Sequence, residues 1–452
     1  MGAMVSRDGD GGATPAYEEL AHDARFAPWV HLNLNVRGLG QSATLAINER
    51  SRQLQAEGRK IYRLGLGQSP FPVPECVVES LRAHAGEKDY LPVQGLPQLR
   101  NAVADYYRRR QGIERSGDDV LVGPGSKELM FLLQLVYYGD LVIPTPSWVS
   151  YAPQARIIGR HVSWVPTTAT DGWPILPEEL DRVCRADPDR PRLVVLNYPS
   201  NPTGQTYSVE ALANLAEVAR KYRVILLSDE IYGELAHDGG HVSIARFYPE
   251  GTIISSGLSK WCGAGGWRLG TFTFPSTLRW LLDAMKVVAS ETFTSTSAPI
   301  QYAAVRAFEG GDEIDEYLMN ARRILKALGN HMQKRLRDAG VMVDPPEGGF
   351  YLFPDFGSIR QQLARNGITS NRVLCEAMLH ATGVAMLPGE DFGRPADELT
   401  ARLAYVDFDG AGALEAARRR PYGSDLGEVF IREHCAPIAE ATDVLTEWIR
   451  KL

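Results

Sequence analysis

The sequence predicts an α/β fold, in which a large domain with a mostly parallel central sheet flanked by helices adjoins a smaller α/β domain. From about residue 30 to about residue 320, short apolar runs alternate with amphipathic segments. Several runs are continuous stretches of Val, Ile and Leu, which is typical of strands buried on both faces of a parallel sheet. After about residue 320 a long helical segment, a glycine turn and shorter strands follow, which indicates the smaller domain.

The apolar runs predict the strands of the large domain. In chain order they are VLV at 120–122, DLVIP at 140–144, HVSWVP at 161–166, RLVVLNYP at 192–199, RVILLSDE at 223–230, TIISS at 252–256 and RLGTFTF at 268–274. The segments between them have helical periodicity. One begins after Ser208, a favourable N-cap, and places Leu212, Leu215, Val218 and Ala219 on one face.

The smaller domain is predicted from ARRILKALGNHMQKRL, a glycine turn at EGGF, the strand FYLFPDF, a helix near 370–381 and the strand RLAYVDF. The predicted organisation has four parts: a mobile, Gly- and Asp-rich N-terminal arm over 1–30, the N-terminal part of the small domain over 31–65, the large domain over 66–320, and the C-terminal small domain over 321–452.

Composition and charge exclude several classes of protein. Hydrophobic residues make up 44% and charged residues 23% of the 452, which is ordinary for a globular protein with a substantial core. The net charge of −7 argues against a nucleic-acid binder. No apolar run approaches the roughly 20 residues that cross a bilayer, and the N-terminus lacks the apolar core of a signal peptide. The five cysteines are scattered, which favours a reducing cytoplasm and no metal site.

Residues with chemistry follow the predicted strands. In open α/β sheets, ligands bind beyond the carboxyl ends of the strands. The candidates at such ends are Trp148, Asn201, Asp229 and Tyr232, together with Gly125, Ser126 and Lys127 in a turn that opens a helix, and Lys260 and Arg268 in a glycine-rich stretch. Backbone N–H groups at a helix N-terminus form a ready site for an anion.

Each of these signals is weak alone, but their combination is specific. Together they supply an amine nucleophile, an anion site with an arginine, an aromatic plate, and a carboxylate with a phenol three residues further on. Pyridoxal phosphate needs a lysine for its Schiff base, a carboxylate for its ring nitrogen and an anchor for its phosphate. The combination therefore predicts this cofactor.

The motifs in series resemble the class I/II aminotransferases of fold type I, in the aspartate aminotransferase superfamily. The matching segments are YLPVQGLPQLR at 90–100, SNPTG at 200–204, SDEIY at 228–232, SKWCGAGGWRLG at 259–270 and RLAY at 402–405. The match covers about residues 35 to 405. It implies the fold of the pyridoxal-phosphate-dependent transferases and a transfer of the amino group between an L-amino acid and a 2-oxo acid.

The resemblance also implies a role for each site residue. Lys260 forms the Schiff base and moves the proton at the substrate Cα, and Asp229 holds the ring nitrogen protonated. Tyr232 and Asn201 bind the ring hydroxyl oxygen, and Trp148 stacks on the ring. The residues implied at the phosphate are Gly125, Ser126, Lys127 and Arg268, with Tyr90 reaching it from a second subunit of a homodimer.

Three residues are implied at the substrate, and one of them is Asn201, which also binds the ring hydroxyl oxygen. Arg402 clamps the α-carboxylate in the bidentate way that a guanidinium allows. Gly67 lets the backbone approach the same carboxylate.

The sequence departs from the family pattern in three places. Gly257 stands where many relatives have a serine that holds the phosphate, and Ser256 or Ser259 is a candidate replacement. The segment 406–435 is longer than the usual link, and its RRR is interpreted as a solvated helix face, with an extra wall near the entrance of the site as the alternative. SETFTSTSAPIQ at 290–301 has no arginine, which weakens the case for a dicarboxylate specialist.

Alternative functions remain open at this point. The same machinery also serves β- or γ-elimination, replacement or cyclisation, as in the related aminocyclopropane carboxylate synthases. A transcription regulator with an aminotransferase-like domain would need a DNA-binding domain, and only about 30 irregular residues precede the fold. The sequence does not distinguish the amino donor, the acceptor or the pathway.

Overall fold

The computed structural model describes residues 31–452, so the predicted arm over 1–30 lies outside the described residues. The chain divides into two compact units between Leu39 and Gly40, and the features below all belong to the second unit. Within the described residues, no helix combines the length and the apolar character needed to cross a membrane.

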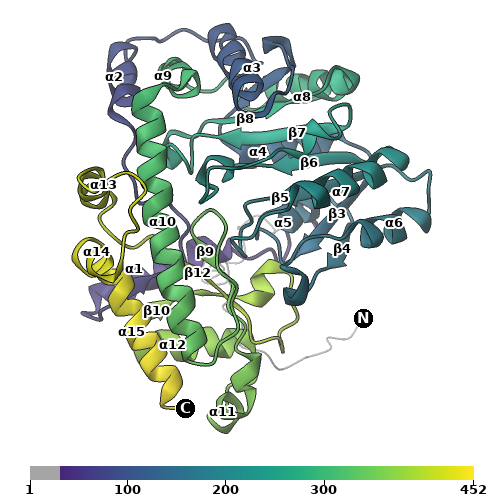
Figure 1. Cartoon of the computed structure of the whole chain (residues 1–452). Coiled ribbons are helices and arrows are strands. Elements are labelled where there is room, and N and C mark those ends of the chain that lie inside the picture. Colours follow the sequence, from purple (N-terminus) through teal and green to yellow (C-terminus); the bar gives the residue numbers. More distant parts are fainter. Residues whose placement is uncertain (1–30) are drawn as a thin grey trace, which may run out of the picture. The chain divides into compact units, whose positions relative to one another are not determined.

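The largest sheet has seven strands in the order β2-β8-β7-β6-β5-β3-β4 (Figure 1). β3 to β7 pair in parallel, whereas β8 is antiparallel to both β7 and β2. The prediction of a mostly parallel sheet is thus confirmed. The strands are β2 (Val120–Gly123), β3 (Asp140–Thr145), β4 (Val162–Pro166), β5 (Arg192–Asn197), β6 (Ile225–Asp229), β7 (Thr252–Gly257) and β8 (Gly270–Thr273).

Helices cover both faces of this sheet. Leu227 of β6 packs in a core cluster with α4 (Ser126–Val136), α5 (Tyr151–Ile157) and α8 (Arg279–Ser290). The neighbouring Leu226 points to the opposite face and packs with α6 (Pro177–Arg185) and α7 (Val209–Lys221). Ser208 caps α7 as predicted, because its hydroxyl accepts a hydrogen bond of 3.1 Å from the Ala211 amide.

A second group of helices shares one core cluster with the long helix α10 (Asp312–Asp338), which runs through the predicted domain boundary at 320/321. α2 (Glu75–Ala83) and α3 (Pro97–Gln111) both pack on α9 (Ala298–Glu309), and α10 packs on α13 (Gly410–Arg418) and α15 (Ala436–Arg450) (Figure 1). The division into domains at 65/66 and 320/321 stays a prediction.

The remaining strands form two small sheets. β12 (Ala401–Ala404) lies between β11 (Leu387–Pro388) and β9 (Tyr351–Leu352), antiparallel to both. β1 (Tyr62–Arg63) pairs in parallel with β10 (Val384–Ala385). The helices that pack on them are α1 (Ala43–Ala56), α12 (Asn371–Thr382) and α15, while α14 (Glu428–His434) packs on α15 and α11 (Arg360–Arg365) is a short separate helix.

The segment 406–435 is ordered by its packing on α10. It contains α13 and α14, and Arg323 of α10 donates hydrogen bonds to the carbonyl oxygens of Ala417, Pro421 and Ser424. The arginines at 418–420 are exposed, as expected of a solvated segment, but α13 ends at Arg418, so Arg419 and Arg420 follow the helix and do not form a face of it.

Candidate active site

Lys260 lies in a loop after β7, where its amine meets the other candidate residues. Its Nζ donates a hydrogen bond of 2.7 Å to the Gly67 carbonyl oxygen and lies 5.6 Å from the centroid of the Tyr232 ring. The pKa of Lys260 is lowered to about 8, first by burial and then by the positive charge of Arg402, while Asp229 acts in the opposite direction. A large fraction of this amine is therefore neutral near pH 8, as a nucleophile requires.

Asp229 ends β6, and its carboxylate is buried at 3% exposure. Burial raises the pKa of Asp229 to about 6, and the hydrogen bonds that it accepts hold the pKa down. Tyr151 donates to Oδ2 at 2.5 Å, and Ser255 donates to Oδ1 at 3.3 Å. Asn197 donates to the Asp229 carbonyl oxygen at 2.9 Å and thereby joins the ends of β5 and β6.

The turn before α4 forms an anion cradle with Arg268. Gly125 is the N-cap of α4 with φ +95°, and a Cβ there would lie 2.1 Å from Nη2 of Arg268. A Cβ on Gly270 would lie 2.1 Å from the Ser126 backbone nitrogen. Glycine is therefore required at both positions if Arg268 is to lie against the helix N-terminus.

Lys127 lies on the same side of the site. Its Nζ is 5.2 Å from the centroid of the Trp148 ring, and its pKa is lowered by burial and by the charge of Arg268. Two cations and an open helix N-terminus thus face one small region, which is a favourable place for a dianion.

The structure explains the glycine at position 257. A Cβ on Gly257 would lie 2.6 Å from the Leu269 carbonyl oxygen and 2.9 Å from the Gly270 Cα, both in the adjoining chain at β8. Ser256 is buried and lies close enough to Tyr107 of α3 to lower the pKa of that phenol against the effect of burial. Ser259 remains the candidate replacement.

Arg402 lies in the central strand of the small sheet and is 1% exposed. It donates hydrogen bonds to Oδ1 of Asn201 at 3.1 Å and to the Gly65 carbonyl oxygen. None of the ion pairs found within residues 31–452 involves Arg402, and its Nε has no hydrogen-bond partner there. A buried guanidinium without a carboxylate is costly, so this arrangement indicates a site for an external anion.

Tyr90 stands apart from these contacts, because its side chain is 89% exposed. The role expected for it, at the phosphate of a second subunit, stays a prediction.

Two tyrosines that sequence reasoning missed belong to this cluster. Tyr151 contacts Asp229 as described above. The hydroxyl of Tyr351 lies 2.8 Å from the Tyr232 hydroxyl, and its ring centroid lies 4.8 Å from Cζ of Arg402. The sequence signals that could have indicated them are the nearby Trp148 for Tyr151 and the predicted strand FYLF for Tyr351.

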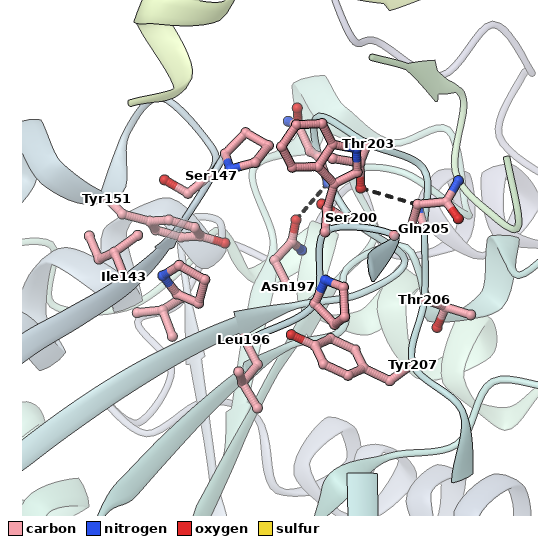
Figure 2. Close-up of a pocket in the computed structure, with 17 residues that line it drawn as sticks. Ile143, Ser147, Tyr151, Leu196, Asn197, Ser200, Thr203, Gln205, Thr206 and Tyr207 are labelled. Atoms are coloured by element: carbon pink, nitrogen blue, oxygen red, sulfur yellow. Dashed lines mark hydrogen bonds between the residues drawn. The ribbon is translucent and has the colours of Figure 1, made fainter. Parts of the chain in front are cut away.

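A small cavity lies behind Asn201, at the carboxyl ends of β3 and β5. Figure 2 shows Tyr151, Asn197, Ser200 and Thr203 around it, with the bond from the Asn201 amide to Oδ1 of Asn197. Its volume is about 30 Å³, which is room for one or two water molecules but not for an amino acid. This cavity is therefore too small to be the amino-acid site.

Comparisons with known proteins agree with this geometry. Residues 59–405 match the family model for aminotransferase class I and II. The chain is 34% identical over 394 residues to aspartate aminotransferase from Geobacillus stearothermophilus, covering 85% of this chain and 96% of that protein. It is 30% identical to asparagine–oxo-acid transaminase from Streptococcus mutans, covering 83% of this chain and 94% of that protein.

A solved structure gives the same result. Aspartate aminotransferase from Thermus thermophilus with maleate superposes with a TM-score of 0.77 at 30% sequence identity, covering 86% of this chain and 98% of that one. The match of fold, sequence and site geometry leads to one conclusion: the chain belongs to the class I and II aminotransferase family and is an aminotransferase.

Proposed function

We propose that the chain binds pyridoxal phosphate through Lys260 and uses it to move an amino group between an L-amino acid and a 2-oxo acid. The observation that carries the proposal is the buried Lys260 amine, which lies 2.7 Å from the Gly67 carbonyl oxygen and 5.6 Å from the Tyr232 ring centroid, with Asp229 and Arg402 near enough to shift its pKa. An amine nucleophile, a carboxylate and an unpaired guanidinium are then available to the same small molecule.

The residues fit the cofactor at both of its charged ends. The cradle of Gly125, Ser126, Lys127 and Arg268 suits the phosphate, since glycine is required there for the arginine to approach. Asp229 suits the ring nitrogen, because a buried carboxylate that keeps a pKa of about 6 is ionised at neutral pH and pairs with an N–H⁺ group. When bound, the cofactor supplies an electron sink for the charge that develops at the substrate Cα.

The other residues then have defined tasks. Lys260, with a pKa near 8, takes and returns the proton at the substrate Cα. Tyr232 and Asn201 bind the ring hydroxyl oxygen, and Trp148 covers the ring face. Arg402 binds the substrate α-carboxylate through two parallel N–H groups, next to the backbone at Gly67.

Aspartate is the first donor that we propose. Three relatives that align with this chain over most of their own length are named aspartate aminotransferases. The absence of an arginine from 290–301 is the sequence feature that argues against a strict dicarboxylate specialist. Elimination, replacement and cyclisation are not favoured, since the relatives named above are transaminases.

We also propose a homodimer with shared active sites, in the cytoplasm. The exposure of Tyr90 supports the first proposal, because an exposed phenol is free to reach a second subunit. The cysteines support the second, because all five are free thiols.

The test is the visible absorbance of the protein loaded with pyridoxal phosphate, while single amino acids are added without any oxo acid. A true donor should bleach the visible band and raise a near-ultraviolet band, and a 2-oxo acid should then reverse the change. The variant Lys260→Ala should be inert. Consumption of the amino acid with an unchanged spectrum and release of ammonia would contradict the proposal and indicate elimination.

A further inference from the structure

Tyr351 contacts two of the proposed site residues with the two ends of one side chain. It lies in β9, is 1% exposed, and its hydroxyl is 2.8 Å from that of Tyr232, which is 2% exposed. Within the described residues the Tyr232 hydroxyl makes no other hydrogen bond. The direction of that hydroxyl therefore depends on Tyr351.

The ring of Tyr351 faces the guanidinium of Arg402. Cζ of Arg402 lies 4.8 Å from the ring centroid, and β9 pairs with β12 so that Tyr351 is opposite Ala404, two residues beyond Arg402. A desolvated guanidinium gains attraction from an aromatic face. Arg402 lacks a carboxylate partner among residues 31–452, so its position depends on its hydrogen bonds and on two rings, that of Tyr351 and that of Phe392, whose centroid lies 5.1 Å from Cζ.

The backbone around the site is shaped to admit the Tyr351 hydroxyl. A Cβ on Gly67 would lie 1.9 Å from Oη of Tyr351, so any larger residue at 67 would displace the phenol. The carbonyl oxygen of the same Gly67 accepts the hydrogen bond from Lys260. The phenol is thus wedged against the segment that also holds the amine.

We infer that Tyr351 is a positioning residue, which sets the place of the Tyr232 hydroxyl through its own hydroxyl and the place of Arg402 through its ring. This inference rests on the proposed function, in which Tyr232 binds the cofactor ring oxygen and Arg402 binds the substrate carboxylate. The side chain of Tyr351 then fixes the position of Arg402 relative to the Tyr232 hydroxyl.

Two substitutions separate the two contacts. Tyr351→Phe keeps the ring beneath Arg402 but removes the hydroxyl, so kcat should fall about fivefold, as for loss of one buried hydrogen bond. The pH at which the visible band of the bound cofactor titrates should also move, with the KM for the amino acid within about twofold. Tyr351→Leu removes both contacts, and its KM should rise about tenfold as well, as for loss of a desolvated cation–π contact.

Tyr405→Phe is the matched control. Tyr405 is also fully buried near the small sheet, and its hydroxyl has no partner within the described residues. This variant should match the wild type in kcat, KM and the titration of the visible band. Thermal midpoints of all variants show whether each is folded.

The outcomes separate the inference from the proposed function. If the wild-type spectrum does not respond to any amino acid, the proposed function fails. If the wild type responds and Tyr351→Phe equals it in both kcat and titration, or raises KM as much as Tyr351→Leu, the role of Tyr351 is overturned and the proposed function stands.

Discussion

The hydroxyl of Tyr151 donates a 2.5 Å hydrogen bond to Oδ2 of Asp229, and both side chains are buried. Burial alone would push the carboxyl pKa upward, and this hydrogen bond works against burial to leave the pKa of Asp229 at about 6. Tyr151 thereby helps to keep Asp229 charged near neutral pH, which is the form that pairs with a protonated ring nitrogen.

Tyr151→Phe should shift the pH dependence of cofactor binding upward. Without the donor, the pKa of Asp229 rises further above 6, so the carboxylate is protonated at a higher pH and loses its pairing with the ring nitrogen. The dissociation constant for pyridoxal phosphate is measured on the apoprotein from about pH 8 down to about pH 5. As the pH falls, this constant should begin to rise at a higher pH in the variant than in the wild type. Tyr137→Phe is the control, since among residues 31–452 its hydroxyl donates a hydrogen bond only to the Arg192 carbonyl oxygen, outside the site. Coincident curves for the wild type and Tyr151→Phe would refute the argument.

Arg402 and Arg268 should have separable effects, because they bind different anions. Arg402→Leu should raise the KM for both the amino acid and the oxo acid by about 100-fold, equivalent to about 3 kcal/mol for a lost bidentate charge pair. Its dissociation constant for the cofactor should change little. Arg268→Leu should do the reverse, weakening cofactor binding by a factor of about 10 or more. Steady-state kinetics at saturating cofactor and equilibrium dialysis distinguish the two, and equal effects on both constants would show that the assignment is wrong.

The sequence predicted the strands, but not the tyrosines that support the candidate site. The seven apolar runs are strands of one sheet. Asp229 and Arg402, which the motifs singled out, lie near enough to shift the pKa of Lys260, and the roles of these residues stay predictions. Tyr151 and Tyr351 could not be found in this way, because a tyrosine beside an apolar run looks like a core residue. Their partners lie 78 and 119 residues away in the chain, and only the folded sheets bring them together.

The sequence also could not decide which of positions 256, 257 and 259 provides a serine for the phosphate. Sequence left Ser256 and Ser259 equal as candidates, since strand direction decides which side chain faces the cradle. The structure buries Ser256 near Tyr107 and packs Gly257 against the backbone at Leu269. Such directions depend on pairing between strands that the sequence does not specify.

Gly257→Ser should destabilise the protein and should not tighten cofactor binding. The new Cβ would lie 2.6 Å from a backbone oxygen, and overpacking of this kind costs about 1–3 kcal/mol. The thermal midpoint should fall, and the dissociation constant for pyridoxal phosphate should stay equal or rise. Gly240→Ser is the control, because a Cβ there meets nothing within 4 Å. A serine at 257 that tightens binding at an unchanged midpoint would mean that β7 and β8 separate easily enough to admit the family's usual contact.

Lys260 should lower the free energy of unfolding of the apoprotein at neutral pH, and this destabilisation should become smaller as the pH rises. Its pKa is about 8 in the folded protein against an ordinary value of 10.5. The unfolded chain therefore binds the proton more tightly, so the full penalty is present below pH 8 and stability rises with pH from about 8 to about 10.5. Lys260→Met removes the charge, and at pH 7 its thermal midpoint should exceed that of the wild type by on the order of 2 °C.

The difference should shrink to less than half by about pH 9.5, because the folded amine is then already neutral. Lys326→Met is the matched control: its amine is about half exposed and paired with Asp238, so its effect on the midpoint should be small at both pH values. Differential scanning calorimetry of the cofactor-free proteins at the two pH values is the measurement. A gain from Lys260→Met that is the same at both would show that packing of the methionine, and not the removal of a desolvated charge, is its cause.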